Sequence, residues 1–463
     1  MKNLKIPNTY FIIFAITVFV AIATWIIPGG EYDKVQKAGK NVVVADSFHK
    51  VESQPQGIGA VLRAPINGFV SAAQIIAFVL IVGGAFSIIQ RTAAIDVAIT
   101  HLVRAHEKIP IVRILLIPLL MLLFSAGGAV FGMSEEIIPF ILIFVPLSLK
   151  LGYDSITGIA IPYVGAHIGF AAAFLNPFTV GIAQGLSDLP LFSGLEFRFV
   201  VWVIFTIISI LYVIRYTKKL KINPAASIMF AEDELHRGQL ENMEGEDNQK
   251  FRRRHKLVLA GFVLGMVLLV FGVLKYEWYI EEIAALFFGL GIAIAIAGRL
   301  SISETTDAFI SGAKDLVGTA LIIGMARGIL IIAQDGMIID TVLFSLSAKI
   351  GSDSPIISSQ IMVLVQTTIN FFIPSGSGQA ALTMPIMAPL ADLVGVSRQT
   401  AVLAYQFGDG FSNMIYPTAP VLMGALSLAK VPWQKWAIWI LPLQIIFIIA
   451  AMLIMIPANQ INW

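Results

Sequence analysis

The sequence predicts an all-α polytopic membrane protein with about nine full spans and two re-entrant helical hairpins, arranged as two inverted repeats. Composition supports this fold class, because the 463 residues are 57% hydrophobic and 13% charged and their mean hydropathy is +0.84. A repeated pattern supports it too: Ser377 follows Ser134 by 243 positions, and Gly395 follows Gly152 by the same number. Duplicated, interrupted hydrophobic segments of this kind are typical of secondary transporters.

Apolar runs near the length of a bilayer crossing place the full spans. They are expected at residues 9–28, 71–90, 155–185, 197–216, 257–275, 283–299, 315–333, 397–424 and 434–456. The first run lacks a small-residue cleavage site, so we interpret it as a retained span rather than a signal peptide. The spans at 155–185 and 397–424 contain Gly, Asn and Pro, which predicts that both helices are broken.

Two further apolar regions, about 110–150 and 355–394, are too long for one crossing. A polar, glycine-containing stretch divides each region near its middle, GMSEE in the first and PSGSGQ in the second. Each region therefore predicts a re-entrant hairpin whose tip stops inside the membrane. Irregular backbone at that depth is tolerated only beside protein or a watery cavity, so the tips are expected to face a binding site.

Lysine and arginine set the predicted orientation. They are concentrated between residues 217 and 256, which marks this segment as a cytoplasmic linker loop. The N-terminus is then cytoplasmic and the C-terminus external, in a cell inner or plasma membrane whose lipid bilayer surrounds the protein. We divide the chain into repeat 1 (1–216), the linker (217–256), an extra span (257–282) and repeat 2 (283–463). Because the extra span adds one crossing, the repeats are inverted and their hairpin tips meet near the midplane.

The tip of the first hairpin contains Ser134, Glu135 and Glu136. A serine followed by two acids can simply cap a helix and complement its dipole. A carboxylate near the bilayer centre costs about 2.5 to 3.5 kcal/mol, however, which favours acids that line a cavity. We predict that at least one of the two acids contacts the substrate or a coupling proton.

The tip of the second hairpin reads Ser375, Gly376, Ser377, Gly378 and Gln379. Alternating glycines let the backbone approach a ligand, and the helix N-terminus that follows offers free amides to an anion such as a carboxylate. A plain flexible break is the alternative, because glycine-rich stretches alone are weak signals.

The broken spans supply further substrate-binding candidates. They are His167, Asn176 and Thr179 in the first copy and Asp409, Asn413 and Thr418 in the second. Asp409 is an acid flanked by glycines inside a span, and we predict a function for it over a structural ion pair. His167 could titrate near neutral pH, yet a lone histidine is more often a packing residue. Asn176 and Asn413 suit ligand contact and backbone repair equally. Arg327 carries less weight, because a structural ion pair explains it at least as well as a substrate carboxylate.

Other functional classes fit the sequence poorly. Cysteine is absent and the histidines are not at ligand spacing, so we expect neither a metal site nor a cofactor. The basic residues flank apolar runs rather than forming one face, so no nucleic-acid partner is expected. An intramembrane enzyme that uses His167 and a carboxylate is a remote alternative, because no nucleophile and base stand at a recognisable spacing.

The strings GMSEE, PSGSGQAALTMPIMAPLADL, QFGDGFSN and IIPGGEY together resemble the YfcC-like branch of the C4-dicarboxylate anaerobic carrier family, over nearly the whole chain. The resemblance implies the ion transporter superfamily, with inverted repeats, two re-entrant hairpins, elevator-like alternating access and often dimers, so a homodimer is an assembly to test. Members that resemble this branch include arginine/ornithine exchangers and carriers named for dicarboxylates, so the family name leaves the substrate open. The Ser-Asn-Thr tips of sodium-dicarboxylate relatives are missing here, which weakens any carry-over of sodium coupling.

These observations predict a secondary active transporter of a small molecule and not an enzyme. The leading hypothesis is an exchanger of cationic amino acids such as arginine and ornithine. Glu135, Glu136 and Asp409 would hold its cationic groups, and the amides of residues 375–379 its α-carboxylate. The runner-up is proton- or sodium-coupled uptake of a carboxylate, in which the acids hold the coupling ion.

Overall fold

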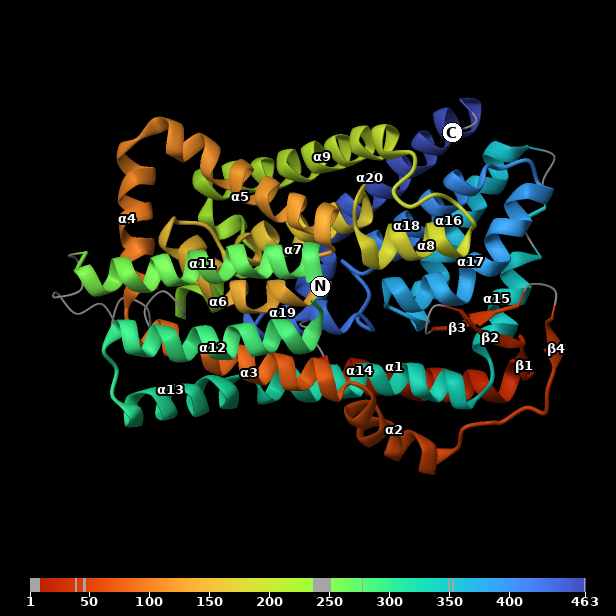
Figure 1. Ribbon diagram of the computed structural model, residues 1–463, viewed down its shortest axis with the longest axis horizontal. Coiled ribbons are helices and arrows are strands. Elements are labelled where there is room, and N and C mark those ends of the chain that lie inside the picture. Colours follow the sequence, from red (N-terminus) through yellow and green to blue (C-terminus); the bar gives the residue numbers. More distant parts are fainter. Residues whose placement is uncertain are drawn as a thin grey trace.

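The computed structural model describes residues 9–37, 40–44, 47–235, 251–276, 278–348, 350–351, 354–461 and 463. Helices dominate these residues, and most run along the long axis of the molecule (Figure 1). In chain order the helices are α1 (Thr9–Ile26), α2 (Ile58–Ser71), α3 (Ala73–Arg91), α4 (Ala94–Lys108), α5 (Pro110–Phe131), α6 (Ile138–Lys150), α7 (Ser155–Ala171), α8 (Ile182–Leu186), α9 (Leu195–Ile222), α11 (Arg253–Tyr276), α12 (Ile280–Gly298), α13 (Ile302–Asp315), α14 (Val317–Asp335), α15 (Ile339–Ser347), α16 (Pro355–Phe372), α17 (Gly376–Leu393), α18 (Arg398–Ser412), α19 (Pro420–Leu428) and α20 (Trp433–Gln460). Short helical turns are η1 (Glu135–Ile137), η2 (Pro177–Gly181) and η3 (Pro224–Ala226), and short strands are β1 (Gly30–Glu31), β2 (Lys34–Lys37), β3 (Lys40–Val43) and β4 (His49–Lys50).

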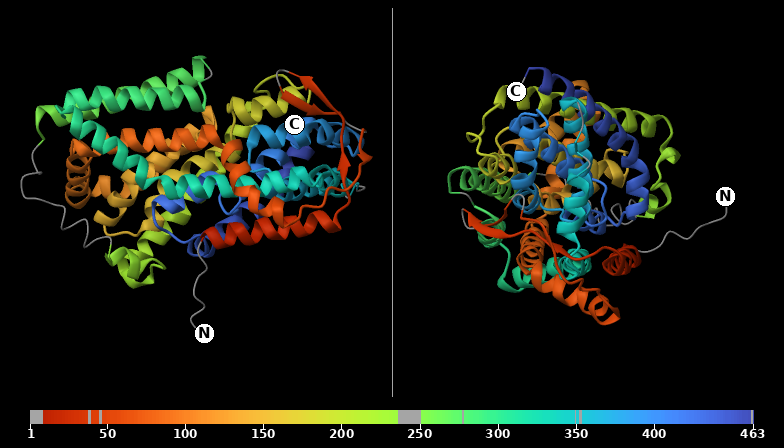
Figure 2. Two further views of the ribbon diagram at one scale, coloured as in Figure 1. Left: turned by 90° about the horizontal axis from the view of Figure 1, so that it is seen from below. Right: turned by 90° about the vertical axis from the view of Figure 1, so that its right-hand side faces the viewer.

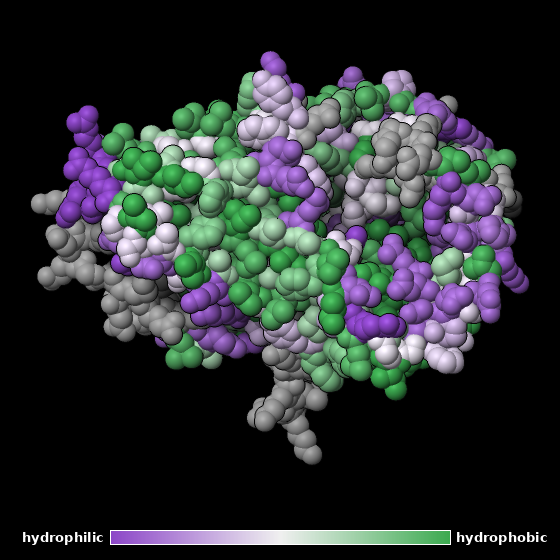
Figure 3. Space-filling model, turned by 60° about the horizontal axis from the view of Figure 1, so that its bottom comes forward, coloured by the Kyte–Doolittle hydropathy of each residue, from purple (hydrophilic) through white to green (hydrophobic). Residues whose placement is uncertain are grey.

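The molecule is a multi-pass helical membrane protein. In the described part of the chain, 8 helices are long and apolar enough to cross a bilayer. Hydrophobic side chains cover most of the middle of the face in Figure 3, and hydrophilic ones gather toward its two ends. These 8 helices are not the same segments as the nine predicted spans. Helices α5 and α16, which were predicted as hairpin arms, are long enough to span, whereas the two broken spans are divided into short helices where the backbone leaves its helical hydrogen-bond pattern.

The same turn forms twice, 243 positions apart. Gly152 and Gly395 both adopt the left-handed conformation, with φ of 80° and 71°, and end the return helices α6 and α17. The next helices then begin at side-chain caps. Asp154 accepts the N–H of the third residue of α7 at 2.9 Å, and Ser397 accepts that of α18 at 3.1 Å. The repeated glycine and polar residues therefore have matching local roles.

Helices α1 to α3 and α12 to α14 form one layer beside the rest of the bundle (Figures 1 and 2). Within it α2 packs on α14, α3 on both α12 and α13, and α1 on α14. The second layer contains the hairpins α5–α6 and α16–α17 together with α7, α18, α9 and α20. The predicted span at 71–90 corresponds to α3, which follows α2 after a break at Ala72. The predicted span at 315–333 corresponds to α14, which continues from α13 through Leu316 in one apolar stretch, Ile302–Asp335.

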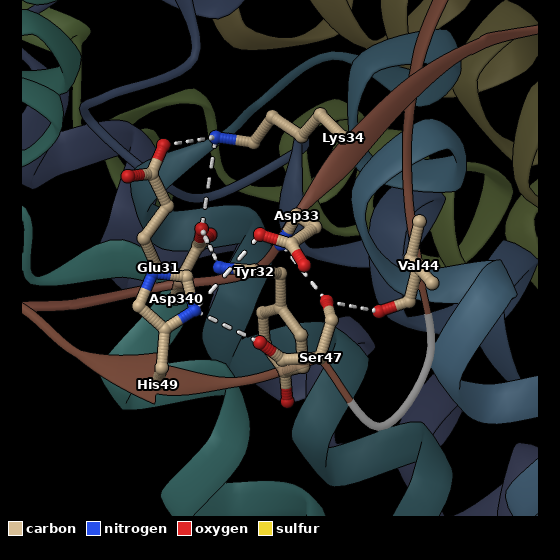
Figure 4. A network of polar contacts seen from close by, with 8 residues as sticks. All are labelled: Glu31, Tyr32, Asp33, Lys34, Val44, Ser47, His49 and Asp340. Atoms are coloured by element: carbon tan, nitrogen blue, oxygen red, sulfur yellow. Dashed lines mark hydrogen bonds and ion pairs between the residues drawn. The ribbon is translucent and has the colours of Figure 1, made fainter.

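The loop after α1 forms two small antiparallel sheets, β1 with β4 and β2 with β3, which the all-α prediction did not include. Pairing of the strands satisfies backbone groups of this loop. The loop is tied to α15: the Tyr32 N–H donates to the Asp340 carboxylate at 3.2 Å, and the Lys34 ammonium lies 3.7 Å from the same carboxylate (Figure 4). Phe48 stacks on Phe344 with ring centroids 4.1 Å apart. The loop therefore anchors the helix that precedes the second hairpin.

The first part of the predicted linker, 217–256, is docked on the second layer. The Asp233 carboxylate accepts the backbone N–H of Ser155 at 2.9 Å, at the first turn of α7. A carboxylate at a helix N-terminus is stabilised by unpaired amides and by the helix dipole. Residues 236–250 of the predicted linker lie outside the described residues, and its last residues begin α11.

Candidate functional site

A cavity of about 260 Å³ lies where the hairpin tips, the broken helices and the bent helices meet. One wall is formed by the tips of both hairpins and the two helix breaks, and the other by the bend between α2 and α3, the start of α12 and the middle of α14. Ten predicted site residues line it: Ser134, Glu135, Glu136, His167, Thr179, Ser375, Gly376, Ser377, Asn413 and Thr418. The other four, Asn176, Gly378, Gln379 and Asp409, lie outside the wall.

The first hairpin tip presents its two acids to the cavity. Gly132 adopts the left-handed conformation, with φ of 76°, and ends α5. The Glu136 carboxylate then accepts the N–H of Ser134 at 2.9 Å, while the Ser134 side chain makes no helix-cap bond. The Ser134 side chain therefore does not take the capping role considered for it. Glu136, which satisfies the Ser134 N–H, is 9% exposed and still lines the cavity beside Glu135.

The second hairpin tip turns only its first three residues toward the cavity. The Ser375 hydroxyl caps α17 by accepting the N–H of Gly378 at 3.4 Å, and the Ser375 carbonyl accepts the N–H of Gln379 at 2.7 Å. The Gln379 side chain is buried and donates to the amide oxygen of Gln366 in α16 at 2.7 Å. Helical rotation thus carries Gly378 and Gln379 away from the cavity, and their amides are already used within the helix.

Asn176 repairs the backbone where the first broken helix resumes. Its side-chain oxygen accepts the N–H groups of Phe178 at 2.9 Å and Thr179 at 3.3 Å, as a cap does. It packs beneath the hairpin tip, where a Cβ on Gly132 would lie 2.6 Å from that oxygen. Of the two roles considered for Asn176, backbone repair fits this geometry, whereas Thr179 reaches the cavity wall.

Asp409 is fully buried one backbone layer behind the cavity. One oxygen of its carboxylate accepts from the Asn413 side chain at 3.2 Å, and the other has no hydrogen-bond partner among the described residues. That second oxygen would lie 3.1 Å from a Cβ on Gly376, so it stands directly behind the second hairpin tip. Asn370 of α16 ties this break together by donating to the Asn413 side-chain oxygen at 2.9 Å. Asp409 is therefore near the site without lining it.

His167 lines the cavity in a fixed orientation. Its ring stacks on that of Tyr163 with centroids 4.0 Å apart, and its Nδ1 lies 3.1 Å from the Tyr163 carbonyl oxygen. Because a carbonyl can only accept, Nδ1 carries the proton. The other ring nitrogen, Nε2, is then the one that can accept a proton or a hydrogen bond.

The cavity wall also contains residues that were not among the predicted substrate-binding residues. Aromatic rings of Tyr163, Phe178 and Tyr279 line the cavity, and Arg327 of α14 reaches it from the opposite layer. The aromatic residues stand among many similar ones in apolar runs, so no local signal separates them. Arg327 did carry a signal, since a cation inside an apolar helix is rare.

The cavity combines both signs of charge with aromatic surface. Two carboxylates come from the first hairpin and a guanidinium from α14, and no described group of three or more His, Asp or Glu side chains could hold a metal ion. A concave site with a few polar groups and aromatic walls suits a small polar molecule.

Comparison with known proteins identifies relatives along the whole chain. YfcC of Escherichia coli strain K12, a protein provisionally named a basic amino acid antiporter, is 38% identical over 474 residues, covering 94% of this chain and 92% of that protein. A Haemophilus influenzae protein is 29% identical over 487 residues, covering 96% and 94%. Among solved structures, the Alcanivorax borkumensis YdaH transporter aligns with a TM-score of 0.46 and 15% identity over 99% of both chains. Neisseria gonorrhoeae MtrF aligns with a TM-score of 0.43 and 17% identity over 98% of this chain and 95% of that one.

The sequence profile of the C4-dicarboxylate anaerobic carrier family matches residues 6–459. This match confirms the family that the hairpin-tip strings predicted, and it agrees with a multi-pass helical structure whose central cavity suits a small molecule. The chain is therefore a membrane carrier of a small-molecule substrate and belongs to the C4-dicarboxylate anaerobic carrier family.

Proposed function

We propose that the protein exchanges basic amino acids of the arginine and ornithine kind across the membrane. The observation that carries this proposal is the pair of carboxylates, Glu135 and Glu136, in the cavity wall with no basic partner at ion-pair distance among the described residues. Two acids without a basic partner in a cavity wall favour a ligand that supplies positive charge. The name of the Escherichia coli relative agrees with this substrate class.

Counterflow in proteoliposomes tests the proposal. Vesicles that contain the purified protein are loaded with ornithine, succinate or buffer, and uptake of labelled arginine is measured. We expect uptake only into ornithine-loaded vesicles. Labelled succinate entering against internal succinate, with no arginine exchange, would replace the proposal by a carboxylate carrier.

A carboxylate carrier coupled to a proton or a sodium ion is the second candidate, and Asp409 favours it. The free carboxylate oxygen of Asp409 and the hydroxyl of Thr179 are both buried without hydrogen-bond partners among the described residues. Gly376 lies next to that carboxylate oxygen and next to the methyl group of the Thr179 side chain. Two such oxygens could hold a coupling ion. Uptake of labelled succinate driven by an imposed sodium or pH gradient would support this alternative.

We also infer two inverted repeats that work by elevator-like alternating access. The pairing of α1 with α14 matches that of α12 with α3, and the pairing of α5 with α7 matches that of α16 with α18, as pseudo-twofold repeats require. The cavity lies between the two layers, so that sliding of one layer past the other would open it to either side.

The same scheme proposes a cytoplasmic N-terminus and an external C-terminus. The chain has no cysteine, so single cysteines introduced at the two ends of α9 report sidedness directly. Both Glu196 and Lys219 are exposed there. We expect Glu196→Cys to react with an impermeant reagent added outside, and Lys219→Cys to react only after permeabilisation; the reverse pattern would contradict the orientation.

A homodimer stays a prediction. Helix α2 leaves Ile58, Leu62 and Ile66 exposed at four-residue spacing, with exposed fractions of 81%, 64% and 65%, and such a stripe can face lipid or a second copy. The mass of the purified protein in detergent, measured by light scattering, distinguishes monomer from dimer.

A further inference from the structure

A single guanidinium enters the cavity from the layer opposite the hairpins. Arg327 lies in the middle of α14, between apolar residues, and its side chain lines the cavity. Its Nε–H donates to the Ser71 hydroxyl at 3.1 Å, and no carboxylate of the described residues lies within ion-pair distance of it. The structural ion pair that would explain an arginine inside an apolar helix is therefore absent from the part of the chain that the structure describes.

Close helix packing fixes the position of this guanidinium. A Cβ on Gly328 would lie 2.6 Å from the carbonyl oxygen of Ala64, and a Cβ on Gly68 would overlap the carbonyl oxygen of Gly324. Helices α2 and α14 thus cross backbone to backbone, which small residues permit. This crossing sets Arg327 beside the last turn of α2, where Ser71 engages one of its five N–H donors and leaves the others for a ligand.

The other predicted anion site is smaller than the sequence suggested, because only the amides of Gly376 and Ser377 have no hydrogen-bond acceptor among the described residues. At the second hairpin tip, the backbone amides of Gly378 and Gln379 donate hydrogen bonds to Ser375 within the first turn of α17. They are therefore not free to receive a carboxylate. Among the groups that line the cavity, the Arg327 guanidinium remains the donor whose planar fork matches a carboxylate with two parallel bonds.

Opposite charges face the same 260 Å³ cavity from opposite layers without pairing to each other. Isolated charges at this depth are unfavourable unless a ligand or water completes them. We propose that Arg327 is a specificity-determining residue that binds the α-carboxylate of the transported basic amino acid, while the carboxylates of Glu135 and Glu136 hold its cationic end. This inference rests on the proposed exchange of basic amino acids and assigns the part of the substrate that α14 recognises.

A pair of ligands that differ only in the carboxylate tests the assignment. Arginine and agmatine share the guanidinium and the amine-bearing chain, but agmatine has no carboxylate. Their dissociation constants are measured by calorimetry on the purified full-length protein, native and with Arg327→Gln or Arg327→Lys. Arg63→Gln is the matched control, because Arg63 is an exposed arginine on α2 whose Nε–H bonds Gly59 in its own helix.

We expect native protein and the Arg63 variant to prefer arginine over agmatine by about 10- to 100-fold, the factor that a charged, hydrogen-bonded contact provides. Arg327→Gln should weaken arginine by that factor and leave agmatine unchanged, and Arg327→Lys should fall between. Equal loss of both ligands, or loss of neither, overturns the assignment. If Arg327→Gln and Arg327→Lys both misfold, the native protein decides. Equal affinity for arginine and agmatine then overturns the assignment, and a preference for arginine of tenfold or more supports it. Native protein that binds neither arginine nor ornithine refutes the proposed function instead.

Discussion

Replacement of Glu136 by glutamine isolates the charge of the first hairpin tip. The Glu136 carboxylate accepts the Ser134 N–H at 2.9 Å, and the amide oxygen of glutamine can accept the same bond, so the turn of the tip should persist. A hydrogen bond to a charged group contributes about 1.5 to 3 kcal/mol and a neutral one about 0.5 to 1.5 kcal/mol. The loss of about 1 to 2 kcal/mol corresponds to roughly 5- to 30-fold weaker arginine binding.

The assay is titration calorimetry with arginine on purified protein, accompanied by thermal unfolding. Because a buried carboxylate is unfavourable in an apolar environment, the neutral variant should unfold at an unchanged or higher temperature. Glu196→Gln is the matched control, since Glu196 is an exposed acid in the first turn of α9. Arginine binding within twofold of the native protein by both Glu136→Gln and Glu135→Gln would refute this prediction and reduce the acids to capping residues.

Three further predictions concern the second hairpin tip and the loop over α15. Gly376→Ala should abolish transport, because its Cβ would lie 2.6 Å from the Thr179 side chain. Gly378→Ala, whose nearest contact is 3.1 Å, should retain most counterflow. Equal activities of the two variants would contradict this prediction. Asp409→Asn keeps an oxygen that accepts from the Asn413 side chain. The variant should lose any sodium or pH dependence of transport while it still binds arginine. An unchanged dependence would exclude Asp409 as the ion site. Burial raises the pKa of Asp340, although the hydrogen bond from the Tyr32 N–H and the charge of Lys34 lower it. Its ionisation in the folded protein is therefore unfavourable and stability falls as pH rises from the unfolded pKa through the folded one, so Asp340→Asn should raise the unfolding temperature more at pH 7 than at pH 4; a constant difference would refute this.

Local rules predicted the turns and hairpins well, because they depend on neighbouring residues. Gly152 and Gly395 take the left-handed conformation that ends a helix, and the polar residues that follow them cap the next helices. The polar interruptions of the two long apolar regions lie at hairpin tips, and the tips meet at one cavity. The spans were predicted less well, since composition alone does not show that α14 continues from α13 through Leu316.

The direction in which a side chain points was the part that local rules missed. Gln379 lies one helical turn beyond the tip and is turned toward α16 by the start of α17. Asp409 was predicted to face the substrate but stands behind Gly376. A shift of one or two residues along a helix changes the facing direction by 100° or more, and sequence alone does not fix where each helix begins.

By itself the sequence determined that this chain is a polytopic helical membrane protein of a carrier family, because hydropathy, helix breakers and repeated motifs act over short stretches of chain. Only the tertiary structure decided which polar groups share the cavity. Arg327 and Glu136 are 191 positions apart and face one cavity because the close crossing of α2 and α14 and the turn of the first hairpin bring them there. Such a meeting depends on how the layers pack, and no local pattern in the sequence encodes it.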